Sequence, residues 1–254
     1  MEGARWAKAL WSWREVMATT AMWCTSSVIV RPFTGPRVPQ KMMHRYFDAV
    51  VRQMGVTIVA TGTEKVIPTT PCVIAVNHNS LLDVPIVGTV LPIDYKWVSK
   101  KEIFYVPFIG WHLWAAGHIW VDRKRRDNME RLAAAFHSAI TAGGSILMFP
   151  EGTRSENGAL QRFKSGAFVT AVDEHVPVLP IVLDGTERLL TKGELDRPSG
   201  ELQVGLHVCD PIPVPTHGDR DEKVATMRDA TRAAMVTALD ALRGGPGRAE
   251  LPTV

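Results

Sequence analysis

The chain has 254 residues with 46% hydrophobic and 22% charged side chains, enough for one sizeable α/β domain and a short appendage. A formal net charge of +3 is too small to indicate nucleic-acid binding, and no zinc-finger, RNA-binding or basic-helix pattern occurs, so we expect no nucleic-acid partner. The three cysteines are scattered, which argues against a disulfide framework and favours a reducing compartment.

The chain begins with a tryptophan-rich segment that predicts a helix at a membrane surface. Four of the eight tryptophans lie within the first 23 residues. At helical spacing Trp6, Leu10, Trp13 and Met17 share one face, and tryptophan favours the membrane interface. The apolar, uncharged run that follows ends at Val30 and is shorter than the ~20 residues that a spanning helix needs. These features predict a monotopic anchor, with an ordinary helix packed on the domain as the alternative.

The expected domain boundaries follow from a proline-rich stretch. Three prolines between Arg31 and Pro39 predict a linker. We expect residues 1–37 to hold the anchor, of one or two helices, and this linker. Residues 38–243 form the main domain, and residues 244–254 form a disordered tail.

Strand and helix patterns alternate through the main domain. Apolar runs predict strands at 56–60, 72–77, 94–98, 118–121, 145–149, 178–183 and 202–208. Helical patterns lie at 41–53, 83–91, 107–115, 127–142, 164–173 and 219–243. This alternation predicts an α/β fold with a mixed, mostly parallel sheet flanked by helices.

The first motif follows the strand expected at 72–77 and reads Asn77-His78-Asn79-Ser80-Leu81-Leu82-Asp83. Open α/β sheets present chemistry at strand ends. If a helix begins around Ser80, the side chains of His78 and Asp83 can meet, and a carboxylate fixes the tautomer that an imidazole needs to act as a base. Without further support, a turn histidine followed by a helix-start aspartate explains the same spacing.

The second motif follows the strand expected at 145–149 and reads Pro150-Glu151-Gly152-Thr153-Arg154-Ser155. Together the two motifs resemble the PlsC-like glycerolipid acyltransferases, the 1-acyl-sn-glycerol-3-phosphate acyltransferase family. Two further blocks resemble the same family, and the resemblance covers about residues 55–210. One block runs from Lys100 to Arg123 with interruptions, and the other is Val178-Leu179-Pro180-Ile181-Val182.

The resemblance implies roles for individual residues. It makes His78 the general base and Asp83 its orienting partner. It places the acceptor's phosphate and glycerol at a set of residues that we expect to bind substrate: Lys100, Glu151, Gly152, Thr153 and Arg154. Lys101 and Arg123 are candidates for neutralising charge, Arg123 having a structural ion pair as its alternative. Glu151 and Gly152 have purely structural alternatives as well. Backbone N–H groups after His78 or at the Glu151-Gly152 turn are candidate oxyanion donors.

A basic segment accompanies these motifs. Residues 96–126 carry an excess of five positive charges. This excess indicates attraction to phosphate, on an anionic substrate, coenzyme A or acidic lipid headgroups, or else an ordinary solvated surface.

The sequence therefore predicts a membrane-associated acyltransferase on the cytoplasmic face of the cell membrane. It would move a fatty acyl chain from acyl-CoA or acyl carrier protein to lysophosphatidic acid, giving phosphatidic acid, with no metal or cofactor. Alternatives are another acceptor (glycerol 3-phosphate or a lysophosphatidylinositol-type lipid), transfer to water, or a non-catalytic membrane-binding module. The expected partners are an acidic phospholipid surface, the lysophospholipid and the acyl donor.

Overall fold

The computed structural model describes residues 2–122, 129–155, 157–190 and 202–244, with the backbone alone for residues 2–10. Its strands are β1 (Val56–Thr61), β2 (Val73–Val76), β3 (Tyr95–Lys100), β4 (Ile119–Val121), β5 (Ser145–Met148), β6 (Val178–Asp184) and β7 (Leu202–Val208). Its α-helices are α1 (Glu2–Thr34), α2 (Arg37–Gln53), α3 (Asp83–Val90), α4 (Ile109–Ala115), α5 (Met129–Thr141), α6 (Gly166–Asp173) and α7 (Arg220–Gly244). Short 3-10 helices include η1 (Thr63–Lys65), η2 (Lys101–Tyr105) and η4 (Thr186–Arg188).

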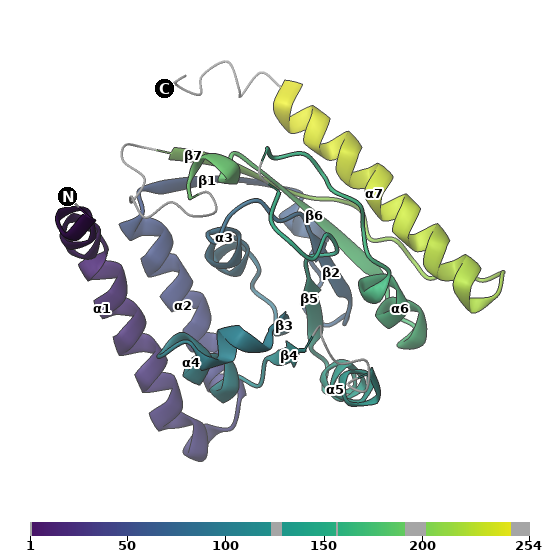
Figure 1. Cartoon of the computed structure of the whole chain (residues 1–254). Coiled ribbons are helices and arrows are strands. Elements are labelled where there is room, and N and C mark those ends of the chain that lie inside the picture. Colours follow the sequence, from purple (N-terminus) through teal and green to yellow (C-terminus); the bar gives the residue numbers. More distant parts are fainter. Residues whose placement is uncertain (1, 123–128, 156, 191–201, 245–254) are drawn as a thin grey trace.

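The strands form one sheet in the order β1-β7-β6-β2-β5-β3-β4 (Figure 1). The neighbours from β6 to β4 pair in parallel, β6 and β7 pair antiparallel, and β7 pairs in parallel with β1. The predicted mixed, mostly parallel sheet flanked by helices is confirmed. Every predicted strand exists within about two residues of its expected ends, as shown by the strand bounds.

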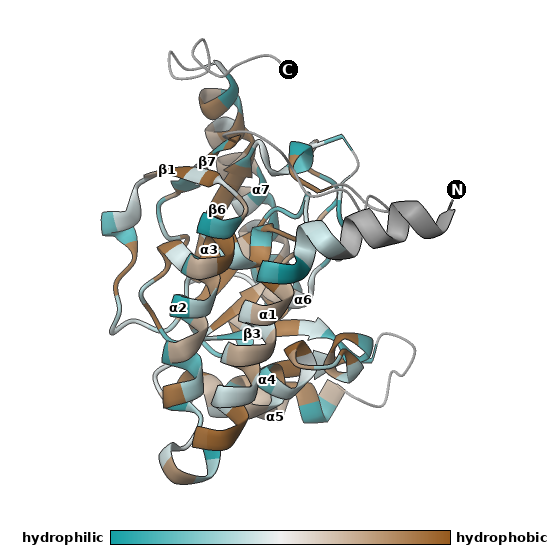
Figure 2. Cartoon of the chain, turned by 90° about the vertical axis from the view of Figure 1, so that its left-hand side faces the viewer, coloured by the Kyte–Doolittle hydropathy of each residue, from teal (hydrophilic) through white to brown (hydrophobic). Residues whose placement is uncertain are grey.

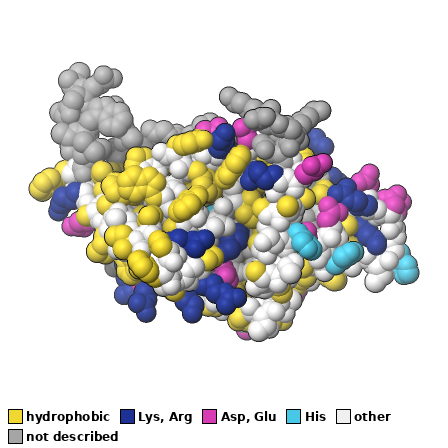
Figure 3. Space-filling view, turned by 90° about the horizontal axis from the view of Figure 1, so that it is seen from below, with side chains coloured by type: hydrophobic (Ala, Val, Ile, Leu, Met, Phe, Trp, Pro, Cys, Tyr) yellow, Lys and Arg dark blue, Asp and Glu magenta, His cyan; other side chains and the backbone are white. Residues whose placement is uncertain are grey.

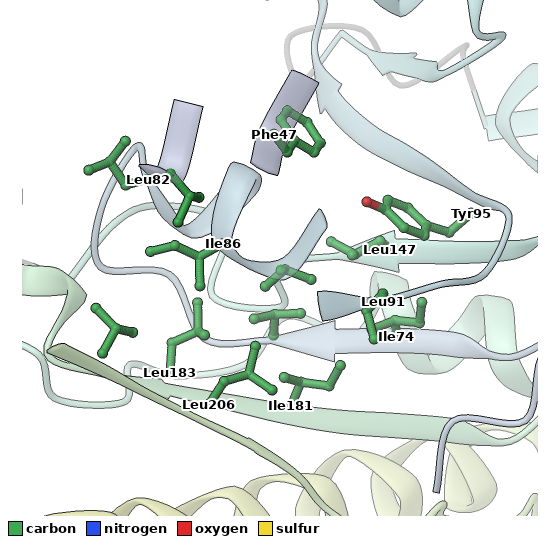
Figure 4. Close-up of a cluster of buried hydrophobic side chains, with 14 of the residues drawn as sticks. Phe47, Ile74, Leu82, Ile86, Leu91, Tyr95, Leu147, Ile181, Leu183 and Leu206 are labelled. Atoms are coloured by element: carbon green, nitrogen blue, oxygen red, sulfur yellow. The ribbon is translucent and has the colours of Figure 1, made fainter. Parts of the chain in front are cut away.

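The central strands are buried along their whole length and mostly apolar, because helices cover both faces of the sheet. Every residue of β2, β5 and β6 is buried, as expected of parallel strands with two covered faces. Alternate residues serve separate cores, so that Ile74 packs with α2 and α3 while Val73 packs with α5, α6 and α7. Figure 4 shows the first core, where Phe47 of α2 and Ile86 of α3 lie above the strands.

The first helix packs on the domain with one side. Val16 and Cys24 are buried. The Thr20 hydroxyl lies 3.0 Å from that of Tyr46 on α2, and Ser27 lies 2.9 Å from His112 of α4. Figure 2 shows α1 crossing in front of the domain. Within the described residues no helix combines the length and apolar character needed to cross a bilayer.

The predicted linker is wrong over most of its length. Helix α1 continues to Thr34 with Pro32 inside it, and α2 already begins at Arg37. Proline is tolerated in the first turn of a helix, where its missing N–H has no intrahelical partner, and this applies to Pro39. The proline count therefore marks a tight turn between two helices. The predicted tail began at residue 244, but Gly244 is the last residue of α7; the rest of the tail, and Arg123, lie outside the described residues.

Candidate active site

Three neighbouring parallel strands bring the sequence motifs to one edge of the sheet. The strands β2, β5 and β3 are adjacent and run in the same direction, so their carboxyl ends lie together. His78 follows β2, Glu151 follows β5, and Lys100 is the last residue of β3. This edge is where an open α/β sheet builds its site.

The imidazole of His78 and the carboxylate of Asp83 are in direct contact. His78 Nδ1 lies 2.7 Å from Asp83 Oδ2. The Asp83 side chain is fully buried, while that of His78 is 18% exposed. With Nδ1–H donating to the carboxylate, Nε2 is left unprotonated and can accept a proton.

Backbone amides hold the aspartate in place. Asp83 Oδ2 also accepts hydrogen bonds from the N–H groups of Asn79 (2.7 Å) and Ser80 (2.8 Å). Helix α3 begins at Asp83 and not near Ser80 as expected, and the Asp83 carboxylate accepts amides of the turn before the helix. One oxygen therefore organises both the turn and the histidine.

Aromatic packing fixes the plane of the imidazole. The ring of His78 stacks on Phe149, with centroids 4.0 Å apart and an interplanar angle of 17°. Phe149 in turn lies 5.8 Å from the Trp97 ring. Since Asp83 fixes one ring nitrogen and Phe149 fixes one ring face, the orientation of Nε2 is set by the protein.

The buried carboxylate of Glu151 is a brace between two loops. Its Oε1 accepts the N–H of His78 and its Oε2 accepts the N–H of Gln161, each at 3.0 Å. Burial raises the pKa of the Glu151 carboxyl, while the two amide donors and the nearby His78 oppose this rise. The Glu151 side chain thus points into the protein, which supports its structural alternative over direct contact with glycerol.

The residues after Glu151 form a tight turn near the surface. Gly152 has a φ of +74°, and a Cβ there would lie 2.7 Å from Lys164 Nζ. Thr153 is exposed and Arg154 is half-buried. No described residue pairs with the guanidinium of Arg154, whose carbonyl accepts the side-chain amide of Gln161. Arg154 therefore stays a candidate for a phosphate contact at this edge of the sheet.

The two lysines expected near the phosphate differ in their surroundings. Lys100 is exposed, and no described residue forms an ion pair with it. Lys101 Nζ lies 3.9 Å from an Asp122 oxygen and 5.3 Å from the centroid of the Trp120 ring. Lys101 therefore has intramolecular partners, whereas Lys100 is the better candidate for a phosphate contact.

Four backbone amides at or beside the expected oxyanion donors are already engaged within the protein. The N–H groups of Asn79 and Ser80 donate to Asp83, and that of His78 donates to Glu151. The N–H of Gly152 donates to the Phe149 carbonyl at 3.0 Å. The expectation that these amides serve the oxyanion is therefore not supported, because each completes a hydrogen bond of the site itself.

Some contributors to the site were missed. The Asn77 side chain forms two hydrogen bonds with the backbone of Leu183 on β6, at 2.7 and 2.8 Å. The Ser80 hydroxyl donates to the Leu190 carbonyl at 3.1 Å. Both residues belong to the first motif, within two positions of His78. Their polar side chains after a buried strand were the available signal, but the partners lie more than 100 residues away.

The fold and the edge of the sheet together define a class. A histidine–carboxylate pair lies at the carboxyl ends of a mostly parallel sheet. The acyltransferase family model matches residues 57–184, half of the chain. The chain belongs to the acyltransferase family.

Its relatives include named enzymes. The 1-acyl-sn-glycerol-3-phosphate acyltransferases alpha of Ovis aries and Homo sapiens are each 34% identical over 184 residues, covering 72% of this chain and 63% and 64% of their own lengths. The chloroplastic acyltransferase BAT2 of Brassica napus is 38% identical over 141 residues, 54% of this chain and 40% of its own. The matched part spans less than two thirds of these relatives.

A solved structure shares the fold. The acyltransferase PlsC from Thermotoga maritima, whose structure is described as that of a 1-acyl-sn-glycerophosphate acyltransferase, superposes with a TM-score of 0.76. The alignment covers 96% of this chain and 100% of that one. At 18% identity this likeness concerns the fold alone.

Proposed function

We propose that this protein transfers a fatty acyl group from a thioester, carried by coenzyme A or acyl carrier protein, to the free hydroxyl of lysophosphatidic acid. The product is phosphatidic acid. The observation that carries the proposal is the contact between His78 Nδ1 and Asp83 Oδ2. Relatives of the chain are named for this reaction.

The proposed chemistry needs a single proton carrier. Nε2 of His78 removes the proton of the acceptor hydroxyl as its oxygen attacks the thioester carbonyl carbon. The tetrahedral intermediate collapses, the carbon–sulfur bond breaks, and the thiolate takes the proton from Nε2. Asp83 stabilises the imidazolium between these steps. The histidine ends in its starting form, and no covalent enzyme intermediate or cofactor is required.

Two cationic side chains are placed to bind the phosphate of the acceptor. Lys100 ends β3 and Arg154 follows the neighbouring strand β5, at the edge that holds His78, and neither has a charged partner among the described residues. Arginine can grip two phosphate oxygens at once, and lysine adds a point charge. The phosphate would thereby anchor the acceptor while its hydroxyl meets Nε2.

Membrane association completes the proposal. Helix α1 exposes Trp11, Met17, Met22, Ile29 and Phe33 to solvent. At helical spacing Trp11, Met22, Ile29 and Phe33 share one side of the helix, and large apolar side chains on one side of a helix that does not span a bilayer fit binding in the plane of the interface. Substrate and product are lipids, so a monotopic enzyme on the cytoplasmic face would meet both at the membrane surface.

Thiol release from acyl-CoA in the presence of an acceptor panel tests the proposal. The wild-type protein should release thiol with lysophosphatidic acid, and His78→Ala should lower turnover by roughly 10²–10⁴-fold. Near-normal turnover in the folded variant would show that His78 is not the base. Thiol release without any acceptor would instead indicate transfer to water.

Arg154→Ala separates the role of the phosphate from the chemistry. Losing one charge-assisted contact should cost about 1.5–3 kcal/mol in kcat/KM with lysophosphatidic acid. The same variant should use a neutral monoacylglycerol as well as the wild type does. An equal loss with both acceptors would mean that Arg154 stabilises the loop and does not recognise phosphate.

A further inference from the structure

The segment between β5 and α6 brings a further cation to the Glu151–Arg154 turn. Just before α6, Phe163 is buried and stacks on Phe168 of that helix, with ring centroids 6.2 Å apart. Lys164 follows it, and its N–H donates to the Pro150 carbonyl at 2.8 Å. The backbone of Lys164 is therefore tied to the residue that begins the turn.

The side chain of Lys164 lies across this turn at Gly152. A Cβ on Gly152 would lie 2.7 Å from Lys164 Nζ and 3.1 Å from its Cδ and Cε. The lysine thus occupies the space that any larger residue at position 152 would need. Gly152 also has a φ of +74°, a backbone conformation that favours glycine. The turn is shaped to accept the stem of this lysine, and the ammonium group ends beside it.

The charge of Lys164 adds to that of Arg154 on the same turn. The Lys164 side chain is exposed, and it forms no ion pair with a described residue. The carboxylate of the turn does not serve as its partner, because both oxygens of Glu151 accept backbone N–H groups. Two positive side chains on one short turn create a local field that attracts anions.

The backbone of the turn offers further donors. Among the described residues, neither the N–H of Thr153 nor that of Arg154 has a hydrogen-bond partner. Successive N–H groups in a turn of this kind form concavities that bind anions. Phosphate oxygens accept hydrogen bonds from both amides and cations. The turn and Lys164 together supply both kinds of donor.

Position, and not exposure alone, distinguishes this lysine. Figure 3 shows lysine and arginine side chains scattered over one face of the molecule, so an exposed cation is common on this protein. Lys164 differs because its backbone and its stem are both held against the turn. The turn in turn contacts the loop of the candidate base, since the N–H of Ser155 donates to the His78 carbonyl at 2.7 Å.

We propose that Lys164, together with the amides of Thr153 and Arg154, binds a phosphate group of a substrate at this turn. The inference deepens the proposed function and rests on it, because both proposed substrates carry phosphate. Lysophosphatidic acid has a phosphate monoester, and coenzyme A has a monoester and a diphosphate. Lys164 lies outside both sequence motifs from which the phosphate ligands were expected.

Steady-state kinetics of K164M test this assignment. Methionine keeps a flexible stem that can lie over Gly152 but carries no charge. The KM of one substrate should rise roughly tenfold, the size of one charge-assisted contact, while kcat stays within about twofold of wild type. A rise for lysophosphatidic acid alone assigns the site to the acceptor, and a rise for acyl-CoA alone assigns it to the donor. Unchanged KM values, a fall in kcat alone, or an equal rise for both substrates would overturn the proposal.

Two further variants control for charge and folding. Arg232 is exposed on α7, so R232M removes the same charge from a helix that does not carry the site. It should leave both KM values within about twofold of wild type, because isolated surface charges contribute little. K164R keeps the charge and should restore most of the lost affinity. Equal effects of K164M and R232M would overturn the proposal. If thermal unfolding shows that K164M is not folded, K164Q replaces it with the same expected rise.

A binding measurement separates this inference from the proposed reaction. Isothermal titration of H78A with glycerol 3-phosphate and with coenzyme A requires no turnover. One of these ligands should bind H78A/K164M roughly tenfold more weakly than it binds H78A. That loss, combined with a wild-type protein that transfers no acyl group, would contradict the proposed function alone. Equal binding by both variants, combined with acyl transfer by the wild type, would contradict this inference alone.

Discussion

At the scale of single residues, Asp83 serves two structural demands with one oxygen. Its Oδ2 receives the imidazole of His78 and the amides of Asn79 and Ser80. The turn before α3 and the tautomer of the histidine are thus determined by the same atom. A substitution can separate the two roles only if it keeps an acceptor oxygen for the amides.

Asp83→Asn makes this separation. The amide oxygen can still accept the two backbone N–H groups, but the side chain can no longer stabilise an imidazolium. We expect turnover to fall by roughly 10²–10⁴-fold while the thermal midpoint changes little. Steady-state kinetics with a thermal melt measure both. A large fall in the melting temperature with a modest loss of turnover would show that Asp83 acts mainly in stabilising the turn and not in catalysis.

Glu151→Gln tests the brace behind the histidine. Glutamine has one acceptor oxygen for the two amides that Glu151 accepts, so one of the N–H groups of His78 and Gln161 loses its partner. We expect a lower kcat and a smaller change in the KM for lysophosphatidic acid. A raised KM with normal kcat would favour the contact with glycerol that the sequence resemblance implied.

The pH dependence of stability gives a second measure of Glu151. Burial raises the folded-state pKa of this carboxyl above the ordinary glutamic acid value of 4.5, so the folded state binds the proton more tightly than the unfolded state does. Its contribution to stability is therefore present below that value and is lost as the pH rises through the folded pKa. The unfolding free energy of wild type minus that of Glu151→Gln should decrease from pH 4 to pH 7. Denaturant titration measures it, and an increase would contradict the direction of the shift.

What the sequence predicted at this scale depended on local spacing. The approach of His78 to Asp83 could be predicted because five positions around a helix start fix the geometry. The roles of Asn77 and Phe149, and the engagement of the candidate oxyanion donors, could not. Their partners come from other strands or from the fold of the turn itself, and a linear pattern does not identify them.

At the scale of elements, α1 is part of the domain. It buries Val16, Cys24 and Ser27 and supplies the partner of the buried His112. Deleting residues 1–37 would expose apolar surface on α2 and α4 and leave His112 without its hydrogen bond. We expect the truncated protein to aggregate or to lose cooperative unfolding, which differs from the separable anchor that the proline pattern indicated.

Size-exclusion chromatography and far-UV circular dichroism of the truncated chain measure this. A monomer with the full helical signal expected of the remaining residues and a sharp melt would show that α1 packs only weakly. The sequence could not decide between the two roles of the tryptophans. A helix of this length has one side for the domain and another for solvent, with apolar side chains on both.

The close packing of α3 against α2 makes a second prediction at this scale. A Cβ at Gly88 would lie 2.1 Å from the Phe47 ring, closer than any real contact. Gly88→Ala should therefore destabilise the protein by about 1–3 kcal/mol through overpacking. Gly166→Ala is the matched control, because a Cβ there meets nothing within 4 Å. Denaturant unfolding of both variants gives the comparison, and equal effects would show that the helices move apart at little cost.

At the scale of the whole molecule, the sequence predicted the strands of the sheet but not their spatial order. The strands and the mixed, mostly parallel character followed from apolar runs and alternation. The spatial order β1-β7-β6-β2-β5-β3-β4 did not, because the pairing of β1 with β7 joins the two ends of the domain. That order is what places the loops after β2, β5 and β3 side by side.

The hydrogen bonds that close the loop around His78 also determine when this loop can form. Asn77 is held by Leu183, 106 residues later, and Ser80 by Leu190, 110 residues later. A ribosome releases His78 and Asp83 well before either partner exists, so both amino acids emerge before the contacts that hold their loop against β6 can form. Distant contacts of this kind form slowly. The nascent chain therefore acquires its reactive centre only once β6 has been synthesised and docked, and an unfinished chain that ends before β6 would contain the whole first motif without an organised site.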